Sequence, residues 1–393
     1  MFRRRIAVAA MAGVFIGLFT LDPGQALAQD VVRIGLVQSL TGPFNTVGKA
    51  VVNGARLYIQ EHGDTVAGRK IELIVKDDGS VPDVGKRLAQ DLIVNDKVAI
   101  LGGGITPSAL TIAPLATEAK IPMVVMVSGA SIATERSPYI VRTSFTLGQS
   151  SSIIADWVVK NGAKKIVTIV NDWAPGVESE TTFKDAAVKG GAQIIESLRV
   201  PLQNPDFSPF LQRARDLGPD TLFVYFPGNQ AGIFAKQFLE RGMDKSGIRI
   251  VGPGDLTDDD ELPGMTDAVL GIVTAHHYSA VHDSALNKSF VADFEKTYAR
   301  RPNFIAVGGY DAMHLIYEAL KKTGGKTDSD GLLAAMKGMK WESPRGPMSI
   351  DPETRDVVHN EYIRKVEKVN GGLYNVEFAT FEAVKDPLKA AKK

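Results

Sequence analysis

The sequence predicts an α/β protein built from two units, each with a parallel sheet that helices cover on both faces. Short apolar strands alternate with amphipathic helices along most of its 393 residues. The alternation begins a second time after residues 139–145, and no low-complexity linker separates the two runs. Two units joined without a flexible connector are expected to face each other across one cleft.

The first run begins with an apolar strand over 31–37 and continues into an amphipathic helix. Apolar residues between Val47 and Ile59 recur at intervals of three and four, as on one face of a helix, and Gly63 is well placed to end it. The remaining elements alternate in the same way: strand 71–75, helix 82–95, strand 98–101, helix 108–119 and strand 122–127.

The second run repeats this pattern and then ends in a helical block and a β tail. The tail alternates in β fashion over 361–378 around Asn370-Gly371-Gly372, which is a hairpin turn signal. The expected helices are 153–160, 177–188, 207–217, 231–241, 284–300, 305–322 and 328–339, and the strands between them are 166–170, 194–200, 222–226 and 248–251.

The first 28 residues predict an export signal that is removed. Arg3-Arg4-Arg5 is a basic start, residues 6–21 are apolar, and Ala26-Leu27-Ala28 has the small-x-small pattern of a cleavage site. A membrane anchor is the alternative, but the apolar stretch is short for one and meets the helix breaker Asp22-Pro23-Gly24. We expect cleavage after Ala28 and, without a nearby cysteine, no lipid anchor.

Composition excludes several classes of function. The 45 basic and 45 acidic residues balance, and loss of the leader, with three arginines and one aspartate, leaves a net charge of about −2. No excess of basic charge is then left to attract nucleic acid or acidic lipid. The chain has no cysteine, which rules out thiol catalysis, zinc–thiolate sites and disulfides. The 365 residues that remain of the 393 suffice for two domains held by their cores.

Three loops that follow strands are equipped to hold an anion. In open parallel sheets ligands bind at the carboxyl ends of strands, where helix N-termini offer unpaired amides. Hydroxyl-rich and glycine-rich loops stand there at 38–44, 102–108 and 128–131, with Thr106 expected as N-cap before Pro107. Plain helix capping is the alternative for each loop. The second loop lacks the Lys-Ser/Thr pair of a phosphate loop, so a nucleotide is not expected.

An enzyme is the first rival reading. His276 and His277 are adjacent, and residues 258–261 form a dense acidic run. Adjacent histidines in a strand point to opposite faces, so we expect that they do not share a metal, and we expect the acidic run to be a solvated loop. No zinc-protease, hydrolase or calcium-loop pattern is present. The sequence therefore predicts no catalytic residues, no metal and no cofactor.

Five segments, in this order and spacing, carry a family resemblance: "RIGLVQSLTGPF", "APLATEAKIPMVVMVSGAS", "VNDWAPG", "DFEKTYARRPNFIAVGGYDAMHLI" and "RGPMSIDP". The chain resembles type I periplasmic solute-binding proteins of the branched-chain amino acid (Leu/Ile/Val-binding) class, which deliver solutes to ABC importers. The resemblance implies two Rossmann-like lobes joined by a three-crossover hinge. It implies an N-terminal lobe of 29–146 plus 279–349 and a C-terminal lobe of 147–278 plus 350–393, after the signal peptide 1–28.

The resemblance also implies where a ligand binds. In this family a hydroxyl and amides from two first-lobe loops hold the ligand's carboxylate, which carries over to 104–106 and to Ala130 and Ser131. The second lobe then closes with an aromatic residue from a Tyr-x-x-Gly loop. That position is Trp173 here, which explains a large apolar side chain in a turn between strand and helix. Packing of Trp173 within its own lobe is the alternative.

The expected ligand class follows from a difference between this chain and the amino-acid binders of the family. Amino-acid binders of this family place a glutamate, which pairs with the ligand's ammonium, where this chain has Gly254 and Asp255. A branch that resembles this sequence handles benzoates and hydroxycinnamates, so we expect an aromatic carboxylate. A branched-chain or other aliphatic amino acid is the alternative if Asp255 reaches the pocket. The expected ligand-binding residues are Ser39, Phe44, Gly104, Ile105, Thr106, Ala130, Ser131, Trp173, Tyr225, Phe226, Asp255 and Tyr278.

The resemblance implies a mechanism and partners. The lobes would close about crossovers near 145–148, 276–279 and 348–352. The closed form, expected to be a periplasmic monomer, would dock on ABC transporter permease subunits in the inner membrane, with no cofactor and no nucleic acid partner. A receptor or repressor module is the second rival. A repressor needs a helix-turn-helix where the leader stands, and a receptor needs a membrane span after the domain, where this chain has "KAAKK".

Overall fold

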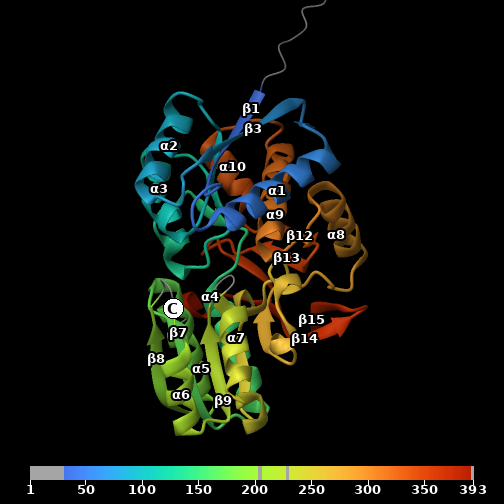
Figure 1. Cartoon of the computed structure of the whole chain (residues 1–393). Helices are drawn as coiled ribbons and strands as arrows, with labels where there is room; N and C mark the ends of the chain where they lie inside the picture. The colour runs from blue at the N-terminus through green and yellow to red at the C-terminus, as the bar shows by residue number, and fades with distance from the viewer. Residues whose placement is uncertain (1–30, 202–205, 227–229, 391–393) are drawn as a thin grey trace, which may run out of the picture.

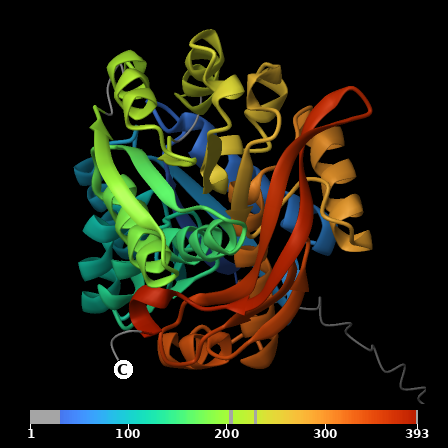
Figure 2. The same ribbon diagram turned by 90° about the horizontal axis from the view of Figure 1, so that it is seen from below.

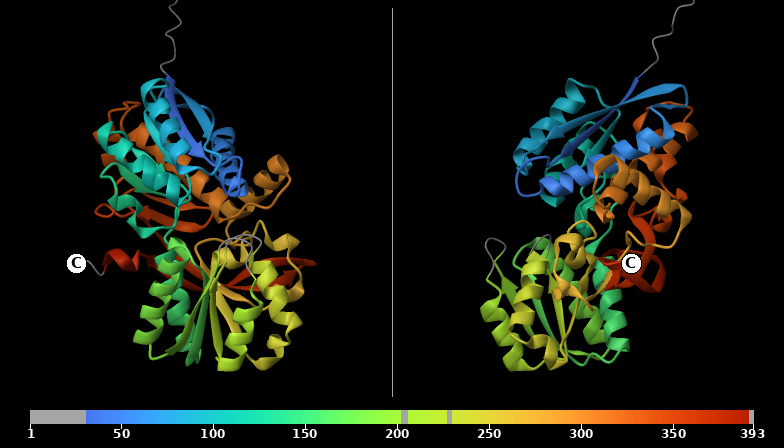
Figure 3. Two further views of the ribbon diagram at one scale, coloured as in Figure 1. Left: turned by 60° about the vertical axis from the view of Figure 1, so that its left-hand side comes forward. Right: turned by 45° about the vertical axis from the view of Figure 1, so that its right-hand side comes forward.

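The computed structural model describes residues 31–201, 206–226 and 230–390. They form an α/β structure with two sheets, each flanked by helices, and Figure 3 shows the resulting two lobes one above the other. The predicted fold class is therefore confirmed. The leader and its cleavage site lie outside the described residues. None of the helices in the described part of the chain combines the length and the apolar character needed to cross a membrane.

The first lobe contains a six-stranded sheet in the order β2-β3-β1-β4-β5-β6. All neighbours in it are parallel except the short hairpin partner β2. In the central strand β1, Ile34 pairs with Leu73 on one side and with Ile100 on the other, and it is fully buried because helices cover both faces. The strands are β1 (Val31–Gln38), β2 (Thr65–Val66), β3 (Arg69–Asp77), β4 (Ile100–Gly103), β5 (Met123–Val125) and β6 (Ile140–Arg142).

Helices from two distant parts of the chain cover this sheet (Figure 1). Helices α1 and α9 approach so closely that a Cβ on Gly54 would lie 1.9 Å from the Ala306 carbonyl oxygen, and one on Gly309 would lie 2.2 Å from that of Val51. Only glycine allows this contact. The helices are α1 (Asn45–His62), α2 (Pro82–Val94), α3 (Thr106–Glu118), α8 (Ala285–Tyr298), α9 (Phe304–Lys322) and α10 (Ser329–Met336).

The second lobe is built on a nine-stranded sheet in the order β12-β13-β14-β11-β10-β9-β7-β8, with β15 paired to β14. Strands β8, β7, β9, β10 and β11 are parallel, whereas β14 is antiparallel to β11 and forms a long hairpin with β15 (Figure 2). The strands are β7 (Lys165–Asn171), β8 (Gln193–Val200), β9 (Thr221–Tyr225), β10 (Arg249–Pro253), β11 (Val273–His276), β12 (Lys340–Ser343), β13 (Gly346–Ile350), β14 (Val357–Val369) and β15 (Gly372–Val384).

Four longer helices and several short 3₁₀ turns complete the second lobe. The helices are α4 (Leu147–Lys160), α5 (Ala174–Lys189), α6 (Ser208–Leu217) and α7 (Gln230–Glu240), and α11 (Pro387–Ala390) ends the described chain. The chain passes between the lobes after β6, after β11 and around β12 and β13, which extend the second sheet through β14. These passages lie near the predicted crossovers, and the lobe boundaries given above stay predictions.

Candidate functional site

Two aromatic rings from opposite lobes meet at the ends of α1 and α5. Phe44 precedes α1 and Trp173 precedes α5, and their ring centroids are 6.4 Å apart with planes inclined by 15°. The sequence forces this placement: Pro175 lies in the first turn of α5, and a Cβ on Gly176 would lie 2.2 Å from the Asn171 carbonyl oxygen. Trp173 is partly exposed, and its buried Nε1 has no hydrogen-bond partner among the described residues.

Two hydroxyl groups from neighbouring first-lobe loops meet each other. The Thr106 hydroxyl lies 2.7 Å from that of Ser128. Helix α3 begins at Thr106 with Ile105 in the capping position, so the expectation that Thr106 is the N-cap is wrong by one residue. The Thr106 side chain therefore makes no capping hydrogen bond to α3. Gly104 lets the loop approach β1, because a Cβ there would lie 2.9 Å from the Val37 carbonyl oxygen.

Ser39 has a supporting role in the structure. Its buried hydroxyl donates to Asp78 Oδ1 at 2.7 Å, and Ser108 donates to Asp78 Oδ2 at 2.6 Å. The Asp78 carboxylate thus ties the loop after β1 to the first turn of α3. The Ser39 hydroxyl proton is engaged there, so this side chain positions the loop.

The loop at Ala130 and Ser131 is held by charged residues that sequence reasoning missed. The buried Arg142 guanidinium donates to the carbonyl oxygens of Ser128 and Ala130 at 2.5 Å each, and to Asp356 Oδ1 at 2.8 Å. With these carbonyl oxygens turned toward Arg142, the loop can present its amides elsewhere. Distant sequence positions supply these contacts, and no local pattern signals them.

Glu178 on α5 accepts a hydrogen bond from a backbone amide that is expected to bind the ligand's carboxylate. The Ser131 amide donates to Glu178 Oε1 at 3.0 Å, and the Ser131 hydroxyl donates to the Asp386 carboxylate. Burial raises the pKa of Glu178, and the Ser131 amide opposes that shift. A carboxylate from the second lobe therefore sits on the first-lobe anion loop. This contact shows that the loop accepts a carboxylate.

Tyr225 and Asp255 lie at the second-lobe side of the same region. Burial raises the pKa of Tyr225, and the nearby charges of Asp255 and Glu178 raise it further. Asp255 is partly exposed as a residue, but its Oδ2 is buried and has no hydrogen-bond partner among the described residues. Burial raises the pKa of Asp255 to about 6, against the opposing influence of Arg364. This carboxyl group is available to a polar partner.

Two of the expected residues face elsewhere. Phe226 is fully buried in the second-lobe core, where its ring lies 4.7 Å from that of Phe207 and 5.0 Å from that of Phe234. Alternation past the end of β9 sends Phe226 away from Tyr225. Tyr278 is fully buried beneath α8 beside Phe290, at a centroid distance of 6.5 Å. Neither side chain belongs to the proposed ligand site.

The acidic run 258–261 is not a solvated loop, so that expectation is wrong. Asp259 is buried, Asp258 accepts a hydrogen bond from Asn303 Nδ2 at 3.0 Å, and Asp260 forms an ion pair with Arg300. Burial and its acidic neighbours raise the pKa of Asp258. The run belongs to the second lobe, whereas Arg300 and Asn303 lie between α8 and α9 of the first lobe. We call these contacts the interlobe latch.

The reason for expecting that the adjacent histidines do not share a metal, namely rings on opposite faces of a strand, does not hold in the structure. Nitrogen atoms of His276 and His277 and a carboxylate oxygen of Glu361 lie within 4.8 Å of one another. Strand alternation does not separate the rings, because β11 ends at His276 and the chain leaves the sheet at His277. One ion could therefore contact both side chains.

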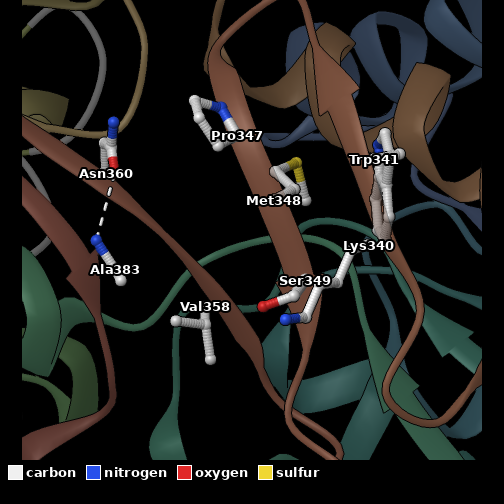
Figure 4. Close-up of a pocket in the computed structure, with 8 residues that line it drawn as sticks. All are labelled: Lys340, Trp341, Pro347, Met348, Ser349, Val358, Asn360 and Ala383. Carbon is white, nitrogen blue, oxygen red and sulfur yellow. Dashed lines mark hydrogen bonds between the residues drawn. The ribbon is translucent and has the colours of Figure 1, made fainter.

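One surface pocket lies away from these residues. A pocket of about 360 Å³ opens over the β12–β15 part of the second sheet, and Figure 4 shows Trp341, Met348 and Asn360 around it. None of the expected ligand-binding residues lines it. The candidate site is the interlobe region around Phe44, Trp173 and Ser131, where side chains of the two lobes meet.

Comparison with known proteins gives the family. Residues 31–372 match the family described as periplasmic binding protein. A relative called Leu/Ile/Val-binding protein homolog 6, from Brucella suis, is 40% identical over 98% of this chain and 100% of its own length.

Two solved structures are similar over almost the whole chain. A solute-binding protein of an ABC transporter from Rhodopseudomonas palustris BisB5, in complex with 3,4-dihydroxybenzoic acid, is 63% identical, with a TM-score of 0.88 over 92% of this chain and 99% of that one. A second one, from strain HaA2 with p-hydroxybenzoic acid, is 41% identical, with a TM-score of 0.88 over 93% and 100%. With its two lobes and its carboxylate-accepting loop, the chain belongs to the periplasmic binding protein family as the non-enzymatic solute-binding component of an ABC transporter.

Proposed function

We propose that the protein captures an aromatic carboxylate of the benzoate or hydroxycinnamate type between its lobes. The observation that carries this proposal is the pair of Phe44 and Trp173, whose nearly parallel rings come from opposite lobes. A flat ring held by these two side chains gains stacking energy of about 0.5–1.5 kcal/mol beyond the burial of its surface. The two similar proteins in complex with hydroxylated benzoic acids support the same ligand class.

The carboxylate end of the ligand would bind the first lobe. The Ser131 amide already donates to a carboxylate, that of Glu178, and the hydroxyls of Thr106 and Ser128 lie on the neighbouring loops. Charge-assisted hydrogen bonds of this kind are the stronger ones in proteins. The ligand would replace Glu178 on the amide, with Gly104, Ile105 and Ala130 shaping the loops around it.

The ring hydroxyl of a hydroxybenzoate would bind the second lobe. Asp255 Oδ2 has no partner among the described residues, and Tyr225 lies near enough for the Asp255 charge to raise the pKa of its hydroxyl. A buried carboxyl oxygen without a partner is costly, so a donor on the ligand would stabilise the complex. This contact would distinguish hydroxybenzoates from benzoate.

An amino acid is the second candidate. The Asp255 carboxylate could pair with an ammonium group, and relatives carry the name Leu/Ile/Val-binding protein. Burial raises the pKa of Asp255 to about 6, however, so an ammonium would have to offset the cost of ionising a desolvated carboxyl. Aliphatic side chains would also make no ring stack with Trp173.

Capture would occur by hinge closure about the three passages between the lobes. The lobes would be 29–146 plus 279–349 and 147–278 plus 350–393, as the resemblance implies, with β12 and β13 at the junction, where they continue the second sheet. The family acts in the periplasm, which agrees with cleavage of the leader after Ala28. We further propose that the protein is a monomer and that its closed form docks on the permease subunits of the transporter.

Calorimetric titration of the purified protein with 4-hydroxybenzoate, benzoate and leucine tests the ligand class. We expect 4-hydroxybenzoate to bind most tightly and leucine not to bind. Trp173→Ala should weaken 4-hydroxybenzoate binding at least about 5-fold, since loss of stacking alone is worth about 1 kcal/mol. The control is Trp157→Phe. The Trp157 ring packs on Phe378, with ring centroids 5.7 Å apart, and neither residue belongs to the proposed site. Binding of leucine alone would overturn the proposal.

A further inference from the structure

A cluster of buried polar side chains lies where β11 and β14 run side by side, and solute capture does not use it. The histidine cluster consists of His276, His277, His359 and Glu361. Antiparallel pairing of His276 with Tyr362 brings the end of β11 alongside Glu361. All four side chains are at most 1% exposed.

The histidines of this cluster lack the partners that buried polar groups ordinarily have. Among the described residues, neither ring nitrogen of His276 and neither ring nitrogen of His277 has a hydrogen-bond partner. A buried polar atom left unsatisfied costs about 1–3 kcal/mol, and native proteins keep few of them. Several in one place indicate that something else binds there.

The spacing and chemistry of the donors fit a metal ion. A nitrogen of His276, a nitrogen of His277 and an oxygen of Glu361 lie within 4.8 Å of one another. Zinc binds imidazole nitrogen at about 2.0–2.1 Å and carboxylate oxygen at about 2.0–2.2 Å, so small side-chain movements would close these three donors around one ion. We propose that His276, His277 and Glu361 form a site for Zn²⁺ or a similar divalent transition metal.

Neighbouring groups orient these donors as outer-shell partners do in metal sites. Ser150 Oγ lies 3.2 Å from Oε1 and 3.1 Å from Oε2 of Glu361, and His359 Nε2 lies 3.3 Å from Oε1. The His277 ring stacks on that of His359 with centroids 4.8 Å apart. Burial also lowers the pKa of both donor histidines, which keeps them in the neutral form that binds metal.

Two buried arginines face the cluster, and each has its own counter-ion. Arg345 pairs with Asp311 at 2.9 Å, and Arg364 lies 3.5 Å from Asp259. Their positive charges lower the pKa of the donor histidines but are balanced by these carboxylates. Burial raises the pKa of Glu361 to about 8, so a divalent ion would displace its proton on binding and add a single net positive charge to the cluster.

Rings at the lobe junction cover the site. The ring centroid of Phe145 lies 5.1 Å from that of His276 and 5.2 Å from that of His277. The ring centroid of Phe304 in α9 lies 4.3 Å from that of His276. Because Phe304 belongs to the first lobe, its ring moves away when the lobes separate, which opens a path for the ion. The bound ion fastens the passage after β11 to β14 and so stiffens one of the three hinge connections.

Cobalt provides the direct test, since Co²⁺ replaces Zn²⁺ and absorbs visible light. Mature, tag-free protein stripped with EDTA is titrated with CoCl₂, and we expect a visible band that saturates at one equivalent and disappears on addition of ZnCl₂. His277→Gln and Glu361→Gln should weaken cobalt binding at least about 10-fold. His314→Gln is the matched control, because this histidine bonds Tyr58 outside the cluster and should leave binding unchanged.

Anomalous diffraction from a zinc-soaked crystal of the unmodified protein places the ion independently of any variant. A peak among His276, His277 and Glu361 supports the proposal even if the variants fail to fold. The absence of a saturating cobalt band, an equal loss of binding in His314→Gln, or an anomalous peak only elsewhere overturns it.

Discussion

At the scale of single residues, Glu178 competes with the proposed ligand for one amide. Its carboxylate accepts from Ser131 at 3.0 Å. Glu178→Gln keeps an acceptor there but removes its charge, and neutral acceptors bind an amide more weakly. We expect 4-hydroxybenzoate to bind about 3- to 10-fold more tightly to this variant, measured by calorimetry, which corresponds to about 1 kcal/mol.

Asp185→Asn is the matched control for this substitution. It removes the same charge from an exposed position on the same helix. Equal effects of the two substitutions would show that only the overall charge of the lobe matters, and weaker binding by Glu178→Gln would contradict the competition.

Asp255 should give the ligand-free protein a defined pH dependence of stability. Burial raises its folded-state pKa from 3.8 to about 6. The folded state then binds more protons than the unfolded state between these pH values, so this residue's contribution to stability falls as pH rises from about 4 to about 6. The loss is about 3 kcal/mol at most, at 1.4 kcal/mol per pKa unit.

Denaturant unfolding of Asp255→Asn and of the unmodified protein at several pH values checks this. As pH rises from about 4 to about 6, the unfolding free energy of Asp255→Asn should increase relative to that of the unmodified protein. A difference that stays constant from pH 4 to pH 7 would contradict the shift. Asp185→Asn, on the exposed surface, should track the unmodified protein throughout.

At the scale of elements, the contact of α1 with α9 depends on glycine. A Cβ on Gly54 would lie 1.9 Å from the backbone oxygen of Ala306, and backbone cannot move aside as a flexible side chain can. Gly54→Ala should reduce the unfolding free energy by about 1–3 kcal/mol, the usual cost of overpacking, as measured by denaturant titration.

Gly232→Ala supplies the comparison within a helix that has room. Among the described residues, a Cβ on Gly232 meets Met265 Cγ alone, at 3.4 Å. Alanine in a helix interior is favoured over glycine by about 0.5–1 kcal/mol, so this variant should be neutral or more stable. Similar losses in both variants would mean that the helix packing is looser than the structure shows.

The elements also show what the sequence could and could not predict. Regular alternation gave most helices and strands, because periodicity survives wherever one face is buried. Strands β12 and β13 were missed because Pro344, Gly346 and Pro347 interrupt any β pattern, and pairing with β14 holds them in the sheet. The buried cations Arg142 and Arg345 were missed for a related reason, since Asp356 and Asp311 are far away in sequence.

In the candidate site, too, some features could be predicted from the sequence and others could not. Trp173 could be expected because a tryptophan at a strand-to-helix turn needs a partner, and Phe44 is that partner. The competition from Glu178 could not be expected, since it depends on how one lobe meets the other. Two adjacent histidines looked separated by strand alternation, yet β11 ends between them.

At the scale of the whole molecule, the interlobe latch should set the balance between closed and open forms. Arg300 of the first lobe pairs with Asp260 of the second, whose side chain is only 8% exposed, and Asn303 donates to Asp258 nearby. A ligand that binds only the closed form loses apparent affinity as that form becomes less populated. Arg300→Gln should therefore shift the ligand-free protein toward open forms and weaken 4-hydroxybenzoate binding about 5-fold, for a partly buried pair worth about 1 kcal/mol.

Small-angle X-ray scattering and calorimetry together distinguish this effect from simple destabilisation. The latch variant should have a larger radius of gyration without ligand and the normal value with saturating ligand, because enough binding energy restores closure. Lys288→Gln breaks an exposed ion pair with Asp283 inside the first lobe and should change neither quantity. If Arg300→Gln scatters like the unmodified protein in both states yet binds more weakly, Arg300 acts on the ligand site and not on the balance between the lobes.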